Sequence, residues 1–512
     1  MTIAQMASKI TNKVEPASAV HPGSLMSLFQ AFDHQAIRYC HWKSNIRLEH
    51  ALTGQTDLDL LVDRARSRAF RQILEEHNVK PLIPPPGRTY PAIESYLGFD
   101  RTDGRLFHLH VHYQLVLGEQ YVKNYRIPVE EYVLNSTRFL HGIRVPSPEW
   151  ELIILSMRAL LKYRDRNAVR DILGTRLPGL PSNIRAEFEW LLNQTSLRQV
   201  SQVLDEVTAI LPADIVCETV ETVVTDPHPG FKLLQLRQRL RRALRRYQRR
   251  SRFHAFLQYS HEQFLRHKLV RRILPERRMT LRTGGQILAF VGADGAGKST
   301  MVREVQKWLA WKVDVRSLYL GSKQPSLRSK LAYQGVRLMR RSWRFAASTT
   351  GEQSIIARFF NFLLQAGIDV HHLSTAQDRY KRSLEGRRRA DSGSIVIYDR
   401  FPLDVSLDGP KIQTQDKERT HKLTRTLAHM EQELYSKISP PDHFVLLDVS
   451  PAVSMQRKPD HDPAAVATKS QVIRALATGG QHASRAKIIW IDADRPFDEV
   501  LNELKCAIWQ LL

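Results

Sequence analysis

The second half of the chain alternates short apolar runs with longer stretches in which apolar residues recur every three or four positions. Such runs are typical of buried strands, and the periodic stretches predict helices. Residues 287–291 predict a first strand, and residues 301–309 predict the helix that follows it. Four further apolar runs predict strands over residues 315–320, 394–398, 443–449 and 487–493. Strands that alternate with helices are typical of an α/β fold built on a doubly wound parallel sheet.

The first half of the chain shows a different pattern. Residues 24–32 suit an amphipathic helix, and residues 37–44 suit a short strand that enters a turn. Residues 57–62 begin with alternating Asp-Leu-Asp-Leu, which predicts a strand with the carboxylates of Asp57 and Asp59 on one face. These elements predict an α+β domain.

A hairpin is predicted where residues 96–100 and 105–117 flank Asp103-Gly104. Alternation along its second strand places three histidines on one face, namely His108, His110 and His112. Such a row is either an exposed strand face or part of a metal site.

Helices dominate the next region. Ser147 can cap a helix that starts at Pro148 and runs to about residue 164, and further helices follow to about residue 211. Residues 232–252 are strongly basic and predict one long amphipathic helix. Its apolar positions are Leu233, Leu236, Leu240 and Leu244. This apolar stripe suits the C-terminal domain, a partner or a lipid surface, and a solvated helix between domains is the default interpretation.

The composition supports packed cores, because 42% of the 512 residues are hydrophobic. A chain of this length suggests roughly three domains. We expect a flexible arm (1–23), an α+β domain (24–175), a helical region with the basic linker (176–284) and an α/β domain (285–512).

The formal net charge of +24 indicates anionic partners. The three cysteines are far apart and suggest neither a disulfide framework nor a cysteine zinc site. No run approaches the length of about 18 apolar residues that a spanning helix needs, and the start of the chain lacks a signal-peptide core. We therefore expect a cytoplasmic protein, with peripheral membrane association still open.

Residues 292–300 carry the strongest chemical signal. They fit G-x-x-x-x-G-K-[ST] between a predicted strand and a predicted helix, the context that a phosphate-binding loop requires. The motif predicts that ATP is bound by Gly292, Ala293, Asp294, Gly295, Ala296, Gly297, Lys298, Ser299 and Thr300. We expect Lys298 to reach the β- and γ-phosphates and Ser299 to ligate Mg²⁺.

A second candidate pair ends the strand predicted over residues 394–398. A carboxylate at the carboxyl end of a central strand, such as Asp399, suits the outer shell of Mg²⁺. The guanidinium of Arg400 can meet a second phosphate as a fork.

Residues 285–512 resemble the thymidylate kinase-like branch of nucleoside monophosphate kinases. The resemblance rests on the phosphate loop with Asp294, on Asp399-Arg400-Phe401, on Leu447-Asp448-Val449-Ser450-Pro451 and on Ile491-Asp492-Ala493. It implies that Asp294 contacts an acceptor sugar hydroxyl and that Asp399 and Arg400 manage the metal and the acceptor phosphate. Some members place a catalytic arginine at the position of Gly295, so the resemblance assigns that charge to the lid, with Arg457 and Lys458 as candidates and residues 459–463 as a mobile segment.

The resemblance breaks after the Asp-Arg pair. Ser406 corresponds to a serine of the family, but the Ala-Tyr-Gln segment that helps to hold the base is absent from residues 402–409. The acceptor is therefore left open.

The N-terminal residues resemble the nucleotidyltransferase superfamily. Lys43-Ser44 stands at the family's Gly-Ser turn, and Gly54-x-x-Asp57-x-Asp59 matches its strand of paired aspartates. A divalent cation relieves the repulsion between two such carboxylates. Histidine stands where the family's third acid is expected, which leaves open a mixed metal site of Asp57, Asp59 and His110, an altered activity or a degenerate domain.

Three functions compete. The leading hypothesis is an ATP- and Mg²⁺-dependent phosphotransferase of the nucleoside monophosphate kinase type that acts on a nucleotide or another phosphorylated small molecule. The second is a bifunctional nucleotidyltransferase and kinase in bacterial surface-polysaccharide synthesis, with residues 232–252 near an anionic glycan or membrane. The third is a catalytically silent nucleotide-binding regulator. Nucleic acid is a less favoured partner, and a homodimer is compatible with the sequence.

Overall fold

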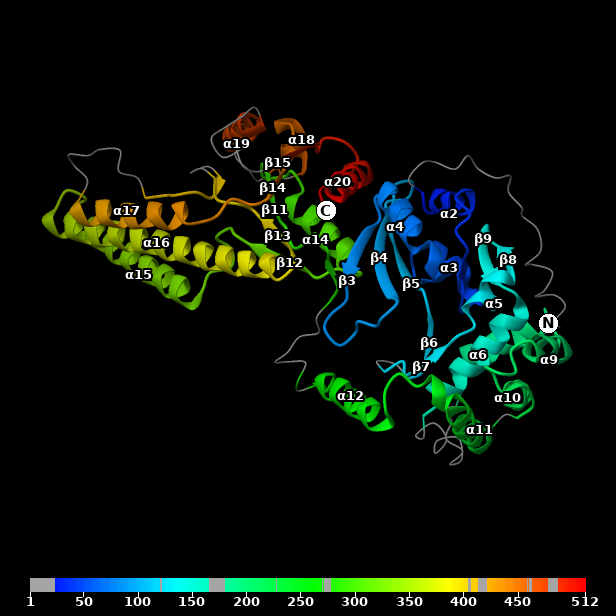
Figure 1. The fold of residues 1–512 in the computed structure, drawn as a ribbon. Coiled ribbons are helices and arrows are strands. Elements are labelled where there is room, and N and C mark those ends of the chain that lie inside the picture. Colours follow the sequence, from blue (N-terminus) through cyan, green and yellow to red (C-terminus); the bar gives the residue numbers. More distant parts are fainter. Residues whose placement is uncertain are drawn as a thin grey trace, which may run out of the picture. The chain divides into compact units, whose positions relative to one another are not determined.

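The computed structural model describes residues 24–119, 122–164, 180–226, 228–268, 270, 278–403, 407–412, 421–457, 459, 463–477 and 487–512. The chain forms two compact units, residues 1–276 and 277–512 (Figure 1). Each unit has its own sheet and is described by itself.

The first unit contains a mixed sheet in the order β1-β2-β5-β4-β3. Its strands are β1 (Tyr39–His41), β2 (Leu58–Val62), β3 (Lys80–Ile83), β4 (Ile93–Asp100) and β5 (Arg105–His112). β2 and β5 pair in parallel, whereas the other neighbours are antiparallel. The predicted hairpin is confirmed as β4 and β5, although its second strand ends at His112 because the chain then forms a separate pair, β6 (Leu115–Leu117) with β7 (Tyr125–Ile127).

Alternation decides which side of this sheet is apolar. Leu58 and Leu60 of β2 and Leu109 of β5 pack in one core with α2 (Leu25–His34) and α4 (Ser67–Glu76). The polar residues between them, among them Asp59 and the three histidines of β5, therefore share the opposite face.

Helices complete the first unit. They are α3 (Leu48–Leu52), α5 (Glu130–Asn135), α6 (Pro148–Lys162), α8 (Ser182–Leu192), α9 (Leu197–Asp205), α10 (Ala213–Thr225), α11 (Gly230–Ala243) and α12 (Arg252–Leu265), with the small hairpin of β8 (Thr137–Leu140) and β9 (Ile143–Pro146) before α6. Helix α6 begins as predicted, because the Ser147 side chain accepts a hydrogen bond from the backbone N–H of Trp150. Eleven of the 15 residues of α6 are buried, so it is the central helix of this part.

The prediction of one long basic helix over residues 232–252 is wrong. Helix α11 ends at Ala243, a 3₁₀ turn follows, and α12 starts at Arg252. The chain leaves the helical path because Gln248 pairs with Tyr125 of β7, and because Arg249 donates its backbone N–H to the Asn124 carbonyl at 2.8 Å. Tertiary pairing here outweighs local helix propensity.

The leucine stripe of this stretch is not an external surface. Leu233, Leu236, Leu240 and Leu244 are buried, and α11 contacts α6 and α10. The expectation that these leucines meet a partner, a lipid surface or the C-terminal domain is therefore corrected, since they complete the core of the first unit.

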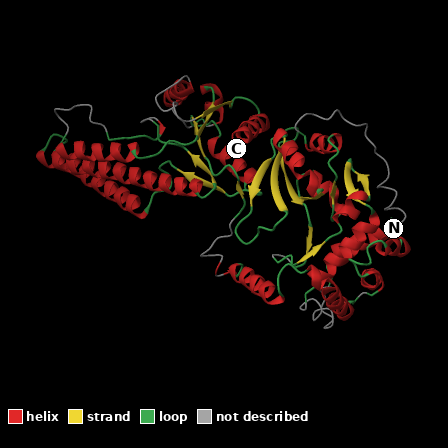
Figure 2. Cartoon of the chain, viewed as in Figure 1, coloured by secondary structure: helices red, strands yellow, loops and turns green. Residues whose placement is uncertain are grey.

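The second unit is built on a five-stranded parallel sheet in the order β12-β13-β11-β14-β15. Its strands are β11 (Ile287–Gly292), β12 (Val315–Tyr319), β13 (Ile395–Asp399), β14 (His443–Asp448) and β15 (Lys487–Asp492). The helices are α14 (Lys298–Leu309), α15 (Leu327–Thr350), α16 (Ile355–Asp391), α17 (Lys422–Ser436), α18 (Pro451–Arg457), α19 (Pro463–Ala477) and α20 (Phe497–Leu511). The predicted parallel α/β architecture is confirmed (Figure 2).

Two long helices of the second unit, α15 and α16, pack against each other as a hairpin. A Cβ at Gly367 of α16 would meet the sulfur of Met339 on α15, so this glycine permits close approach of the two helices. Helix α17 packs on α16 through Leu427 and Ala428 against Leu373. Within the described ranges, no helix combines the length and apolar character that crossing a membrane requires.

Candidate functional site

The phosphate loop lies between β11 and α14, at the carboxyl end of a central strand. Gly295 and Gly297 have φ of 88° and 82°, a left-handed conformation that favours glycine. A Cβ at Gly295 would also lie 2.9 Å from the carbonyl oxygen of Ser454. The glycines therefore let the backbone curl before α14, whose first N–H groups and dipole suit an anion.

Lys298, the first residue of α14, is buried under this loop. Its Nζ donates to the carbonyl oxygens of Gly292 and Ala293 at 2.8 and 2.7 Å. Burial, helped by the nearby charge of Arg400, lowers the pKa of Lys298 to about 8. A small pocket of about 20 Å³ lies beside it, lined among others by Asp294, Arg400 and Asp408.

Ser299 and Asp399 meet next to the loop. Ser299 Oγ donates to Asp399 Oδ2 at 2.9 Å, because β13 pairs in parallel with β11 and brings Asp399 opposite Phe290. The other carboxylate oxygen of Asp399 is buried and has no hydrogen-bond partner among the described residues. A hydroxyl and a carboxylate with a spare oxygen suit a hard cation such as Mg²⁺.

A chain of alternating charges extends from this point. Arg400 lies 3.2 Å from Asp294 Oδ1 through one nitrogen and 3.0 Å from Asp408 Oδ2 through another. Lys469 of α19 contacts the second oxygen of Asp294 at 2.5 Å. Burial alone would raise the pKa of Asp294, but the hydrogen bond from Lys469 and the charges of Lys298 and Arg400 hold it well below its usual range.

The backbone of Arg400 supports a specialised role. Its φ is 72°, which is unusual for a residue with a side chain. Such strain persists only where the surroundings hold it, and it is concentrated at functional sites. Here the two ion pairs of the guanidinium hold it.

A buried arginine, Arg379, holds Asp408 in place from its other side. Arg379 of α16 donates to the Leu320 carbonyl at 2.8 Å and lies 3.0 Å from Asp408 Oδ1. It also contacts the hydroxyl of Tyr435 on α17. Arg379 therefore fixes Asp408, which in turn positions Arg400.

Of the two lid cations that the resemblance implies, the structure describes Arg457. Arg457 is exposed and donates to the Ala493 carbonyl, in the segment after β15, at 3.0 Å. Lys458, residues 460–462 and Ser406 are outside the described residues.

Lys469, which the sequence reasoning missed, supplies a second cation beside Asp294, on the carboxylate oxygen that Arg400 does not contact. A signal existed, because Lys469 and Arg474 are the two basic residues in residues 463–477. Periodicity alone could not show which side of α19 faces the loop.

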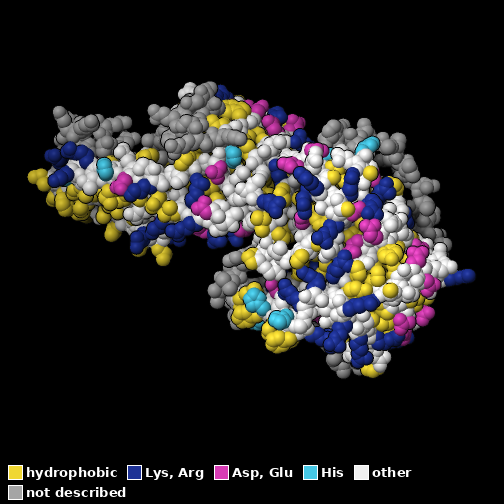
Figure 3. Space-filling view, viewed as in Figure 1, with side chains coloured by type: hydrophobic (Ala, Val, Ile, Leu, Met, Phe, Trp, Pro, Cys, Tyr) yellow, Lys and Arg dark blue, Asp and Glu magenta, His cyan; other side chains and the backbone are white. Residues whose placement is uncertain are grey.

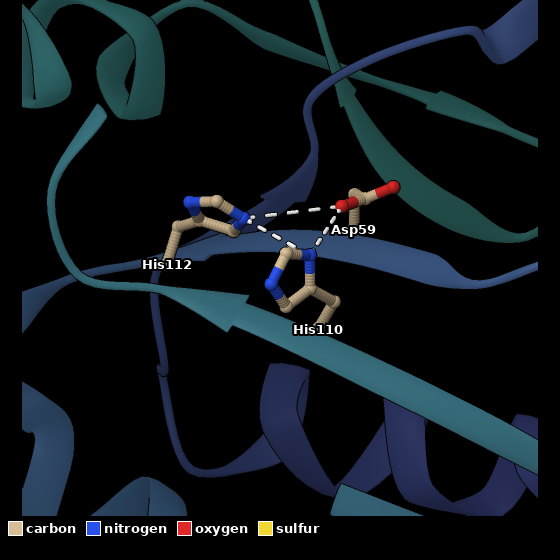
Figure 4. Close-up of side chains that lie close together, drawn as sticks. All are labelled: Asp59, His110 and His112. Atoms are coloured by element: carbon tan, nitrogen blue, oxygen red, sulfur yellow. Dashed lines mark hydrogen bonds and ion pairs between the residues drawn. The ribbon is translucent and has the colours of Figure 1, made fainter. Parts of the chain in front are cut away.

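The first unit contains a second polar cluster (Figure 4). Asp59 Oδ1 lies 2.9 Å from His110 Nδ1 and 3.8 Å from His112 Nε2, and the two imidazoles are 3.3 Å apart. One ligand atom from each of the three residues falls within 4.8 Å of the others, a spacing that could hold a metal ion. Burial lowers the pKa of both histidines, which favours the neutral, metal-competent form.

A lysine competes for the same carboxylate oxygen. Lys43 Nζ lies 2.6 Å from Asp59 Oδ1. Burial would raise the pKa of Asp59, but the charge of Lys43 and the hydrogen bond with His110 keep it well below its ordinary value. Burial and the neighbouring Lys43 charge lower the pKa of Lys123 to about 8. The Asp59 charge acts in the opposite direction, so Lys43 and Lys123 both interact with this carboxylate.

Asp57 belongs to a different contact. It precedes β2, and its carboxylate lies 2.9 Å from His108 Nδ1. This distance is that of an ion pair, but the geometry at His108 Nδ1 does not satisfy a hydrogen bond. The described structure therefore groups Asp59 with His110 and His112, and Asp57 with His108.

The basic stretch borders a cavity of about 490 Å³ in the first unit. Its lining includes Arg237, Arg241, Arg242, Arg252, Asn124, Tyr125, Phe256 and Tyr259. Among the described lining residues, Glu119 is the single acidic one, and it lies 2.8 Å from Arg241. Arginines beside aromatic rings suit an anionic ligand with a planar or apolar part.

Comparison with known proteins identifies relatives of part of the chain. No protein-family model matches. The "Uncharacterized ATP-binding protein YghR" of Escherichia coli K12 is 32% identical over 231 residues, which cover 43% of this chain and 86% of YghR. The "Uncharacterized ATP-binding protein YghS" of the same organism is 26% identical over 244 residues, covering 44% of this chain and 92% of YghS.

A solved structure also matches loosely. It is the structure of deoxyadenosine kinase from M. mycoides with bound dATP, with 14% sequence identity, 44% of this chain and 98% of that chain covered, and a TM-score of 0.26.

YghR is 32% identical to this chain, and the match covers 86% of the length of YghR. The chain described here therefore belongs to the family of YghR.

Proposed function

We propose that the second unit transfers the γ-phosphate of ATP to a phosphorylated small-molecule acceptor, in the manner of a nucleoside monophosphate kinase. The observation that carries the proposal is the contact of Ser299 in the phosphate loop with Asp399 at the end of β13, with Arg400 beside it. The name of the relative YghR, an ATP-binding protein, supports a nucleotide in the loop.

Each residue of the cluster has a role in this proposal. The loop amides and Lys298 grip the β- and γ-phosphates, and Arg400 meets the acceptor phosphate. Ser299 and Asp399 would hold Mg²⁺, which neutralises charge on the phosphates when it is bound. Asp294 orients an acceptor hydroxyl, and Lys469 keeps its carboxylate ionised and in place.

The test is phosphoryl transfer by the full chain with ATP and a panel of acceptors. The panel contains nucleoside monophosphates, dTMP among them, nucleosides and sugar phosphates. Steady multiple turnover with one class of acceptor supports the proposal and identifies that class. Tight ATP binding without turnover on any acceptor would instead favour a nucleotide-binding regulator.

Two matched substitutions, at Lys469 and at Arg457, test which of these side chains supplies the cation that the proposed reaction needs. Lys469→Gln is expected to lower kcat about 10- to 100-fold, because Asp294 and the acceptor lose their positioning. Arg457 contacts the Ala493 carbonyl, and its described hydrogen bond does not involve Asp294. Arg457→Gln is therefore expected to change kcat less than about threefold, because the acceptor keeps its positioning. Steady-state kinetics measures kcat for both variants. A larger loss of kcat in Arg457→Gln than in Lys469→Gln would show that Arg457 supplies the catalytic cation.

A second function is proposed for the first unit, namely metal-dependent nucleotidyl transfer in the synthesis of a bacterial surface polysaccharide. The cluster of Asp59, His110 and His112 favours it, because a carboxylate and two neutral imidazoles are metal ligands. The cations Lys43 and Lys123 suit a triphosphate near such a metal.

This second function predicts the behaviour of a double variant. Asp57→Ala with Asp59→Ala should abolish metal-dependent nucleotidyl transfer while ATP turnover by the second unit continues. The exposed Asp205→Ala of α9 is the matched control. Release of pyrophosphate from nucleoside triphosphates with a sugar phosphate measures the activity, and full activity in the double variant would show that the unit has no such chemistry.

The basic stretch is proposed to contact an anionic glycan or a phosphorylated ligand in the cavity of the first unit. Its arginines border that cavity, and its leucines are buried in the core of the first unit. Buried leucines remove the apolar contribution that membrane binding by this stretch would need.

A further inference from the structure

We propose that helix α15 of the second unit lies on an anionic membrane surface. Four apolar side chains of α15, Leu327, Leu331, Leu338 and Phe345, are between 66% and 79% exposed. Their spacing of four, seven and seven residues places them along one side of the helix. They form the apolar stripe of α15.

The opposite side of α15 is the side that faces the protein. Ser329 and Val336 are buried there, and Ala346 is buried on the adjoining side. Ser329 Oγ donates to Asp378 Oδ2 of α16 at 2.7 Å, and Met339 packs against Gly367. These contacts fix the rotation of α15 about its axis, so the apolar stripe is held outward.

The charge of α15 has a single sign. Its 24 residues include six basic side chains, Arg328, Lys330, Arg337, Arg340, Arg341 and Arg344, and no Asp or Glu. Among the described residues, no ion pair engages any of these six. At 100° per residue, Lys330, Arg337, Arg341 and Arg344 fall along one flank of the apolar stripe.

The apolar surface continues onto the start of α16. Ile355, Ile356 and Phe359 are exposed just after the turn at Gly351. Figure 3 shows apolar side chains along the outer edge of the α15–α16 hairpin, with Lys and Arg beside them. A stripe of Leu and Phe next to cations is the pattern of a helix that lies in a lipid interface.

Charge complementarity selects an anionic lipid surface as the occupant. A second copy of the chain would bring another helix without a single acidic residue, so two such surfaces repel each other. An anionic membrane satisfies the apolar stripe and the flanking cations together. This surface is independent of the proposed reaction and differs from residues 232–252, whose leucines are buried.

The test is cosedimentation of the full chain with lipid vesicles, with and without an anionic phospholipid. We expect binding to the anionic vesicles that weakens with salt, and little binding to neutral ones. Arg337→Gln with Arg341→Gln should weaken binding about 30-fold, since each cation near such a surface contributes about fivefold. Leu331→Ser with Leu338→Ser should weaken it at least about tenfold.

Matched controls lie on the same unit. Arg303→Gln with Lys307→Gln removes two charges from α14, and Leu423→Ser removes an exposed apolar side chain from α17. Both should bind vesicles like the unchanged chain, and circular dichroism should show that all variants fold.

Three results would overturn the proposal. The first is vesicle binding that the α15 variants leave unchanged. The second is loss of binding in Arg242→Gln with Arg252→Gln but not in the α15 variants, which would assign lipid contact to the first unit. The third is a dimer in sedimentation velocity that Leu331→Ser with Leu338→Ser dissociates, which would make a second copy the occupant.

Discussion

Replacing Lys298 with alanine is expected to lower the rate of ATP turnover about 100- to 1,000-fold. The residue begins α14 inside the phosphate loop, and its amine is already desolvated against the carbonyls of Gly292 and Ala293. In the proposed reaction this buried cation acts on the transferred phosphate in a medium of low dielectric, so its removal would leave charge in the transition state uncompensated. The measurement is kcat for ATP in the presence of the acceptor that the panel identifies.

The control for this substitution lies on the same helix. Lys307→Ala removes the same charge from an exposed position of α14, so its kcat should stay within about twofold. Isothermal titration with ATP and Mg²⁺ separates binding from chemistry. Undiminished turnover in Lys298→Ala would remove the basis for phosphoryl transfer at this loop, whereas equal losses in both variants would point to damage of α14.

Replacing Arg379 with methionine is expected to destabilise the second unit by about 3–5 kcal/mol. Arg379 is 1% exposed and donates to the Leu320 carbonyl while it pairs with Asp408. Methionine of similar length leaves that carbonyl unsatisfied and removes one of the two arginines that face Asp408. Hydrogen exchange of the amides of α16 and β13 in the full chain measures the local loss of stability.

Two further variants test the cause. Arg388→Met, at an exposed position near the end of α16, should be within about 0.5 kcal/mol of the unchanged chain. Arg379→Met with Asp408→Asn should be less destabilised than the sum of the single changes, because the two side chains share one ion pair. Additive losses would show that the Arg379 contacts with Leu320 and Tyr435, and not the pair with Asp408, hold this region.

The loss should extend to catalysis. Arg400 keeps a left-handed backbone with help from Asp408, and Asp408 is held by Arg379. In Arg379→Met at low temperature, where the unit is still folded, we expect KM for the acceptor to rise more than KM for ATP. The reason is that Lys298 and Ser299 depend on the loop itself, whereas Arg400 depends on this chain of contacts.

Local sequence signals predicted the elements that depend on neighbours in the chain. The glycines before Lys298, the cap at Ser147 and the alternation around His110 each act within a few residues, so each could be predicted from the sequence. The predicted strands of the second unit follow equally from short apolar runs.

Contacts between residues far apart in the sequence could not be predicted from local patterns. Lys469 reaches Asp294 across 175 positions, and Asn124 ends the helical path of the basic stretch from 126 positions away. No periodicity reports which side of α19 faces the loop or which strand edge competes for a helical segment.

The same distinction explains the two basic stretches. Residues 232–252 and α15 look alike in sequence, since both combine leucines at helical spacing with arginines. In the first the leucines are buried against α6 and α10, whereas in α15 they remain exposed. The sequence by itself determined the phosphate loop, the parallel α/β unit and the strand alternation, because these arise from backbone conformation and nearby side chains. Only the tertiary structure decided that Lys469 joins Arg400 at Asp294, which histidines join Asp59 and which amphipathic helix exposes its leucines among the described residues, because each depends on what packs against a side chain from far along the chain.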